Sequence, residues 1–225
     1  MQHTDIIKEK AAPIVDLIYN DGFVQGLING DLDKEAVAHY LRADSRYLKS
    51  FLDVYAILLA KTSHLDEKKY LLEQVLFLMD GEHDAHHNLA EYIGIPYEEI
   101  IADGEWYPAA DHYIKHMLYN AYAKPFEYAI AASTPCPWVY FEIATRILKE
   151  HTITDDHPFK VWIDFYADDM VRDIMNSLDT IMNKYCDKAS EKEQKELYKN
   201  FLESCEHERN FFNMAYTQQR WLVEL

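Results

Sequence analysis

The chain has 225 residues, 49% of them hydrophobic and 27% charged, a composition that excludes a disordered chain and a small disulfide scaffold. Its 39 Asp and Glu residues outnumber its 22 Lys and Arg residues, and a formal net charge of −17 argues against a nucleic-acid partner. No linker, repeat or low-complexity tract divides the chain, so we predict a single domain over residues 1–225.

Glycine and proline are sparse, with six and seven copies, and apolar residues recur at three- and four-residue steps, so we predict an all-α helical bundle. Asn20-Asp21-Gly22 is a stop signal after the first helix, and Ser190 with Glu193 forms a capping box before the last. The predicted helices cover 3–19, 33–61, 66–93, 108–122, 125–133, 137–151, 158–186 and the residues after 190, with a loop or short turn over 97–106.

The cysteines and the apolar pattern also indicate a compartment. Cys136, Cys186 and Cys205 are odd in number and far apart, as is usual for reduced intracellular thiols. The first ten residues lack a signal core, and no stretch reaches the ~20 apolar residues that a membrane helix needs. We therefore predict a cytoplasmic protein with no membrane partner.

One cysteine stands between two prolines in ASTPCPWVYFEIA, residues 131–143. Pro137 suits the first turn of a helix, which would place Cys136 at or next to the N-cap. Free amide N–H groups and the helix dipole at that end lower the pKa of a thiol, and Tyr140 follows one turn later. The pattern is typical of a positioned nucleophile, although this segment alone favours an ordinary buried cysteine.

Carboxylates occur on aromatic stripes in two further places. Asp44 lies three residues before Tyr47, and Glu208 lies three residues before Phe211. Taken singly, each is more simply explained as a helix-surface acid. A buried carboxylate, in contrast, could hold a proton or pair with a protonated ring nitrogen.

These residues together suit a flat, polar aromatic ligand. Tyr113 and Tyr166, in apolar helical contexts, would add further rings, although one tyrosine among 17 is weak evidence. Aromatic rings would stack the ligand, two carboxylates would pair with its amino and ring-nitrogen edges, and the thiolate of Cys136 would attack it. The lack of a phosphate-binding glycine loop argues against a nucleotide.

At this point the chain resembles the thiaminase II (TenA) family over essentially its whole length. The segments that carry the resemblance are Arg42-x-Asp44-x-x-Tyr47, Ser133 to Tyr140, Tyr166 after Trp162, and Glu208-x-x-Phe211. The resemblance implies a fold like that of haem oxygenase, usually assembled as a homotetramer. It also implies thiamine salvage by hydrolysis at the methylene carbon that joins a 4-amino-2-methylpyrimidine to its leaving group, with neither metal nor organic cofactor.

The resemblance further implies a role for each site residue. Cys136 would add to a ring carbon, Glu208 would protonate or hold a ring nitrogen, and Asp44 would accept hydrogen bonds from the 4-amino edge. The other residues of the implied pocket are Tyr47 and Tyr113 in the wall, Tyr140 and Tyr166 for proton handling, and Phe211 for stacking. Family members commonly have Phe-Trp where this chain has Phe211-Phe212, which leaves the preferred leaving group open.

Two other interpretations compete. A di-iron oxidase of similar fold could use a carboxylate and histidine cluster, but the stretch 159–186 that would have to complete it contains aspartates and no histidine. The candidate ligands are Glu82, His83, His86, His87, Glu142, Asp169 and Asp173. We expect the three histidines to be mostly structural or solvated, with one of them buried. A non-catalytic regulator or pyrimidine-binding protein would have no need of the thiol at Cys136.

Overall fold

The computed structural model describes residues 1–80, 83–102 and 105–223, and these ranges contain helices but no strand, which confirms the all-α prediction. Most predicted helices are present within a few residues of their predicted bounds. The helices are α1 (His3–Asn20), α2 (Gly22–Asn29), α3 (Lys34–Lys61), α4 (Leu65–Asp80), α5 (His83–Ile93), α6 (Tyr97–Ile100), α7 (Pro108–Ala123), α8 (Phe126–Ser133), α9 (Pro135–Glu150), α10 (Lys160–Tyr166), α11 (Asp169–Cys186) and α12 (Glu191–Thr217).

Polar caps fix where the two longest helices begin. The Asp33 side chain accepts hydrogen bonds from the N–H groups of Glu35 and Ala36 at the start of α3. Ser190 and Glu193 form the predicted capping box at the start of α12. Because both caps are local, the sequence alone predicts these boundaries well.

The structure differs from the predicted helices in four places. The predicted helix 66–93 is two helices, α4 and α5, and the predicted helix 158–186 is α10 and α11. At the second break, Asp168 caps α11 by accepting from the Met170 N–H. The short helices α2 and α6 fall where no helix was predicted, and α2 ends at Gly30 in the left-handed region, with φ of 72°.

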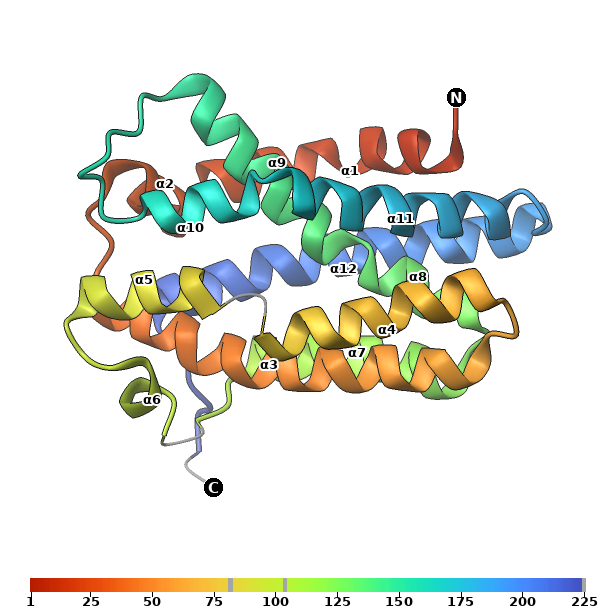
Figure 1. Ribbon diagram of the computed structural model, residues 1–225, viewed down its shortest axis with the longest axis horizontal. Helices are drawn as coiled ribbons and strands as arrows, with labels where there is room; N and C mark the ends of the chain where they lie inside the picture. The colour runs from red at the N-terminus through yellow and green to blue at the C-terminus, as the bar shows by residue number, and fades with distance from the viewer. Residues whose placement is uncertain (81–82, 103–104, 224–225) are drawn as a thin grey trace.

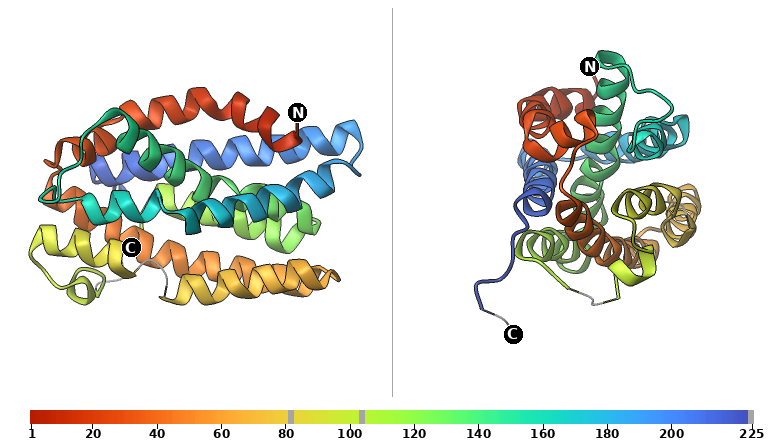
Figure 2. Two further views of the ribbon diagram at one scale, coloured as in Figure 1. Left: turned by 45° about the horizontal axis from the view of Figure 1, so that its top comes forward. Right: turned by 90° about the vertical axis from the view of Figure 1, so that its left-hand side faces the viewer.

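Most helices run along one axis in two groups (Figure 1). The first group contains α1, α10 and α11, and the second contains α3, α4, α5 and α7. Helix α12 packs against α1 of the first group and against α3 and α7 of the second. Helix α9 crosses the others obliquely, as both views in Figure 2 show. Its N-terminal end is buried and its C-terminal end is exposed, so the crossing carries the first turn of α9 into the space between the two groups.

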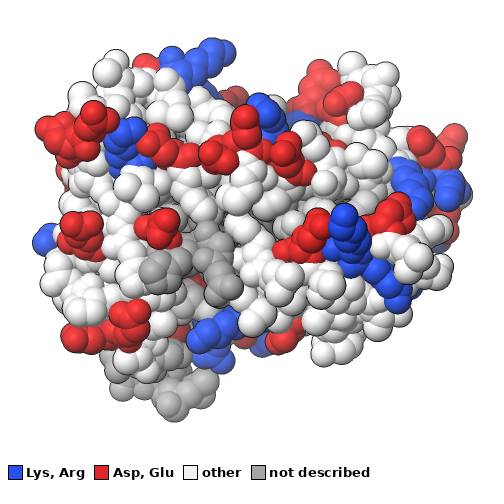
Figure 3. Space-filling view, in the orientation of Figure 1, with Lys and Arg blue, Asp and Glu red and all other residues white. Residues whose placement is uncertain are grey.

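A cluster of buried apolar side chains extends from Ile7 to Ala215 and contacts nearly every helix. Over the described ranges, no helix combines the length and apolar character that crossing a bilayer requires. Acidic side chains are spread over the face shown in Figure 3, with basic side chains scattered among them, in keeping with the net charge of −17.

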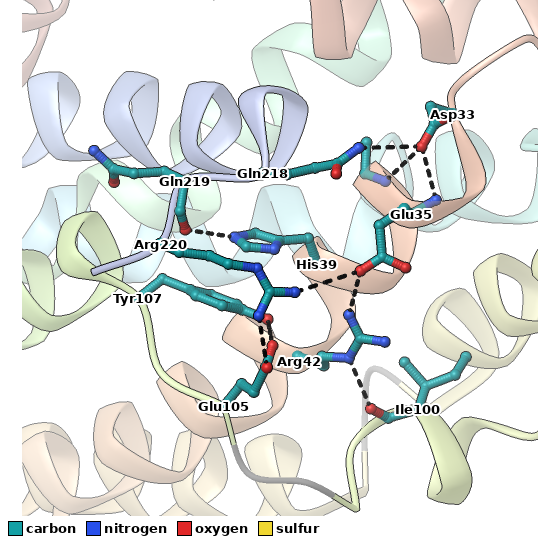
Figure 4. Close-up of polar contacts among 11 residues, drawn as sticks. Asp33, Glu35, His39, Arg42, Ile100, Glu105, Tyr107, Gln218, Gln219 and Arg220 are labelled. Atoms are coloured by element: carbon teal, nitrogen blue, oxygen red, sulfur yellow. Dashed lines mark hydrogen bonds and ion pairs between the residues drawn. The ribbon is translucent and has the colours of Figure 1, made fainter. Parts of the chain in front are cut away.

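The segment after α12, residues 218–220, is held against the start of α3 by hydrogen bonds and an ion pair (Figure 4). The fully buried His39 donates through Nε2 to the Gln219 carbonyl at 2.9 Å and stacks on Tyr107, with 3.5 Å between ring centroids. Arg220 bonds Glu105 at 2.7 Å. Burial lowers the pKa of His39 to about 4, so its imidazole is neutral at pH 7.

Candidate active site

Five helices, α3, α4, α9, α10 and α11, line a pocket between the two groups of helices. Aromatic and aliphatic side chains make up most of its wall. The predicted site residues in that wall are Asp44, Tyr47, Cys136, Tyr140 and Tyr166. The structure thus brings together five residues that come from three separate helices.

Helix α3 supplies one side of the pocket through a stripe of side chains. Asp44, Tyr47, Phe51 and Tyr55 occur at three- and four-residue steps, so they lie on one helical face. All four are buried in the folded chain. The predicted placement of one carboxylate among aromatic rings is therefore correct.

Cys136 reaches the pocket through the junction between α8 and α9. Thr134 is fully buried there and keeps helical backbone angles, so the two helices join without an extended loop. Thr134 is the N-cap and Cys136 is the second residue of α9, which corrects the predicted cap position of the cysteine. Pro135 and Pro137 remove two amide N–H groups from this turn, but the half-buried thiol still lies at the positive end of the dipole.

Glu208, Tyr113 and Phe211 form a second layer directly behind Tyr47. The Tyr113 hydroxyl donates to Glu208 Oε1 at 2.6 Å, and both side chains are buried. The Tyr47 ring lies 5.1 Å from that of Tyr113 and 5.5 Å from that of Phe211, between centroids. All eight predicted site residues therefore belong to one contiguous cluster, although these three are not part of the pocket wall in this structure.

Three tyrosines of the cluster are protonated at neutral pH and can therefore donate hydrogen bonds. Burial is the main cause that raises the pKa of Tyr47, Tyr113 and Tyr140 well above the ordinary value. After burial, the cause that raises the pKa of Tyr47 most is the negative charge of the Cys136 thiolate. For Tyr113 the corresponding cause is the negative charge of Glu208. Protonated phenols therefore surround the thiol and the carboxylate.

Tyr140 has a partner that sequence reasoning missed. Its hydroxyl lies 2.9 Å from that of Tyr40, one turn before Asp44 on α3. Tyr166 lies 4.6 Å from Tyr140 between ring centroids, and Phe212 packs 5.1 Å away on another side. Phe212, the position at which this chain departs from the family pattern, is thus fully buried behind the pocket wall.

Asp44 also has an unexpected partner, because its Oδ2 accepts a hydrogen bond from His86 Nε2 at 2.8 Å. His86 is the buried histidine that we expected in its segment. The i+3 and i+4 spacing of the segment indicated a metal cluster, and nothing in the sequence indicated a pairing between α5 and α3. Only the packing of these two helices brings the side chains together.

Gln74 is a further residue that the sequence did not single out. It lies on the inner face of α4, lines the pocket and is 7% exposed. Its amide makes no hydrogen bond within the described part of the chain. An amide at the pocket wall without a protein partner is available to a ligand.

A family model described as TENA/THI-4/PQQC matches residues 8–218. The chain belongs to this family. An aminopyrimidine aminohydrolase of Staphylococcus epidermidis is 44% identical to this family member over 216 residues, which cover 96% of the chain and 94% of the relative. The resemblance predicted from the site segments is therefore confirmed.

Solved structures agree on the fold of this TENA/THI-4/PQQC family member. A TenA family transcription regulator from Silicibacter sp. has a TM-score of 0.84 at 25% identity, covering 96% of this chain and 97% of that one. A haem oxygenase from Leptospira interrogans has a TM-score of 0.60 at 12% identity, covering 94% and 98%, and this likeness concerns the fold alone. The predicted haem-oxygenase-like fold is confirmed.

The histidines of the predicted metal alternative have different partners in this family member. His86 bonds Asp44, whereas His87 Nε2 lies 3.8 Å from Glu98. Glu142 accepts from the Trp138 indole at 3.1 Å. Among the residues that the structure describes, no three His, Cys, Asp or Glu side chains are arranged to hold a metal ion. Glu82 and the His83 side chain lie outside the described part.

Proposed function

We propose that this family member hydrolyses the bond between a 4-amino-2-methylpyrimidine methylene and its leaving group, in thiamine salvage. It would convert the aminomethyl-pyrimidine to hydroxymethylpyrimidine, and thiamine to hydroxymethylpyrimidine and a thiazole. The observation that carries the proposal is the half-buried thiol of Cys136 in a pocket that also presents a carboxylate and several phenols. The reaction class, an aminopyrimidine hydrolase, is that of relatives 42 to 44% identical to this chain.

The proposed reaction begins with the Cys136 thiolate, which forms a C–S bond to a ring carbon while a ring nitrogen takes a proton from Glu208. The electron pair gained by the ring then expels the leaving group from the methylene, as neutral ammonia from the protonated aminomethyl-pyrimidine or as neutral thiazole from thiamine. Water adds to the exposed methylene carbon and loses a proton. The C–S bond then breaks, the thiolate departs, and the ring nitrogen returns its proton to Glu208.

The remaining groups bind and orient the ring in this proposal. Asp44 accepts hydrogen bonds from the 4-amino edge, the buried Tyr47 packs against the ring, and Phe211 supports Tyr47 from behind. The Tyr113 hydroxyl, 2.6 Å from Glu208, keeps that carboxyl group in place. Tyr140 and Tyr166, whose ring centroids lie 4.6 Å apart in the pocket wall, would handle the proton that water releases.

The test compares the wild type with Cys136→Ser on the aminomethyl-pyrimidine and on thiamine, following hydroxymethylpyrimidine by chromatography. We expect kcat to fall by at least ~10³-fold, because the serine hydroxyl is a far weaker nucleophile at neutral pH. Cys186→Ser is the matched control, since Cys186 is fully buried and distant from the pocket wall. We expect this control to retain wild-type turnover.

Two outcomes would contradict the proposal. Equal turnover by the wild type and Cys136→Ser would remove the thiol from the mechanism. A wild type that turns over neither substrate would point to the regulatory or metal-dependent alternatives. About two irons per purified chain, with activity lost on chelation, would favour the di-iron alternative.

We also propose a cytoplasmic homotetramer built from one domain over residues 1–225. Leu72, Leu76 and Met79 support an assembly, because they form an exposed apolar stripe on α4. The buried cluster from Ile7 to Ala215 supports the single domain. Light scattering tests the assembly, and a stable monomer at micromolar concentration would contradict it.

A further inference from the structure

His86 and Asp44 form a buried pair at the wall of the pocket. Asp44 lines the pocket from α3, whereas His86, on α5, contacts Asp44 but is not itself part of the pocket wall. The distance from His86 Nε2 to Asp44 Oδ2 is 2.8 Å, and each side chain is 5% exposed. Because a carboxylate oxygen accepts hydrogen bonds, the His86 Nε2–H is the donor.

The His86 ring is held in place by its surroundings. It stacks on Tyr97 of α6, with 5.5 Å between ring centroids and 20° between planes. Ala85 and Leu89, its neighbours on α5, are fully buried in the core. A ring packed in this way presents its N–H in a fixed direction, so the hydrogen bond also fixes the plane of the Asp44 carboxylate.

The bond to His86 leaves the two oxygens of Asp44 in different situations. Oδ2 is occupied, whereas Oδ1 has no hydrogen-bond partner among the described residues. We propose that His86 is a positioning residue, which holds Asp44 through Oδ2 so that Oδ1 receives the amino group of an aminopyrimidine. The inference rests on the proposed function for the identity of this ligand.

A carboxylate without this support would rotate about its χ2 bond and would lose the directional part of its contact with an amino group. The contact exists in both the bound substrate and the transition state, so its loss should raise KM and change kcat little. A merely structural role for His86 would instead weaken every ligand alike.

The experiment measures binding by calorimetry, which does not depend on turnover. The two ligands are hydroxymethylpyrimidine and the same molecule without its 4-amino group. We expect the wild type to bind the amino compound about 10- to 100-fold more tightly, as charge-assisted hydrogen bonds to a buried carboxylate predict. In His86→Leu we expect the ratio of the two dissociation constants to fall below about fivefold. The KM for the aminomethyl-pyrimidine should rise by the same factor by which this ratio falls.

Two further variants separate positioning from stability. His86→Gln places an amide donor near the former position of Nε2. We expect this variant to recover most of the wild-type preference for the amino compound. His39→Leu removes an equally buried histidine with one hydrogen bond at the opposite face of α3, and we expect the wild-type ratio there, whatever its thermal stability.

Each outcome decides the proposal. An unchanged ratio of dissociation constants in His86→Leu, or equally weaker binding of both ligands, would refute the proposal. A wild type that binds the two ligands with equal affinity would refute it as well. A wild type that discriminates the amino group through His86 but catalyses no hydrolysis would leave the positioning role standing and overturn the proposed reaction instead.

Discussion

Lowering the pH from 8 to 5 should destabilise the folded chain through two buried histidines, His39 and His207. Burial is the main cause that lowers the pKa of each to about 4, and the neighbouring His116 and His112 lower that of His207 further. In the unfolded chain both would titrate near 6.5. The unfolded state therefore binds more protons between these pH values, and stability must fall as the pH falls through this window.

The magnitude follows from the two pKa values. Between pH 8 and pH 5 each histidine removes about 2 kcal/mol of unfolding free energy, rising to about 3 kcal/mol below pH 4. The pair thus removes about 4 kcal/mol at pH 5, a large share of the stability of an ordinary domain. The consequence reaches the site, because His207 stacks on Tyr113, which donates to Glu208.

Urea unfolding at pH 8 and pH 5, followed by circular dichroism at one protein concentration, measures this effect. The comparison is between the wild type and the double variant His39→Gln/His207→Gln, since every other titrating group is common to both. We expect the variant to lose about 4 kcal/mol less than the wild type between the two pH values. Equal losses, or NMR titration of either histidine near 6.5, would refute the reasoning.

Two substitutions near the pocket have distinct expected effects. Tyr113→Phe removes the donor 2.6 Å from Glu208 Oε1, and we expect kcat/KM to fall by about 10- to 100-fold with little change in fold, measured by the chromatographic assay and circular dichroism. Wild-type kinetics in this variant would show that the hydrogen bond has no catalytic role. Gln74→Met replaces an amide at the pocket wall that lacks a protein partner with an apolar side chain, so we expect unfolding free energy to rise by about 1 kcal/mol while kcat/KM falls. A less stable variant with unchanged kcat/KM would contradict that expectation.

The sequence predicted best those parts of the fold that local chemistry determines. The Asp33 and Ser190 caps and the stops at residues 20–22 and 94–96 are short-range signals, and the corresponding helix ends lie close to the prediction. The break between α10 and α11 was missed because the apolar spacing continues across it. The capping side chain of Asp168 was a local signal that would have revealed it.

The site divides in the same way. The stripe of Asp44 and Tyr47 on α3 and the thiol of Cys136 could be identified from spacing and from the adjacent prolines. Asp44 and His86 are separated by 42 positions in the sequence, and Tyr40 and Tyr140 by 100 positions. Helical periodicity indicates which face of a helix is buried but not which helix covers it, so these contacts depend on tertiary packing.

The three thiols differ in exposure and in pKa, so covalent labelling can report on the pocket selectively. Cys136 is half-buried at the pocket wall, whereas Cys186 and Cys205 are fully buried, and burial raises the pKa of Cys186 to about 11 and that of Cys205 well above its ordinary value. An alkylating probe should therefore modify one cysteine per folded chain. Any compound that fills the pocket should slow that modification, so mass spectrometry of intact chains could rank ligands without knowledge of the leaving group.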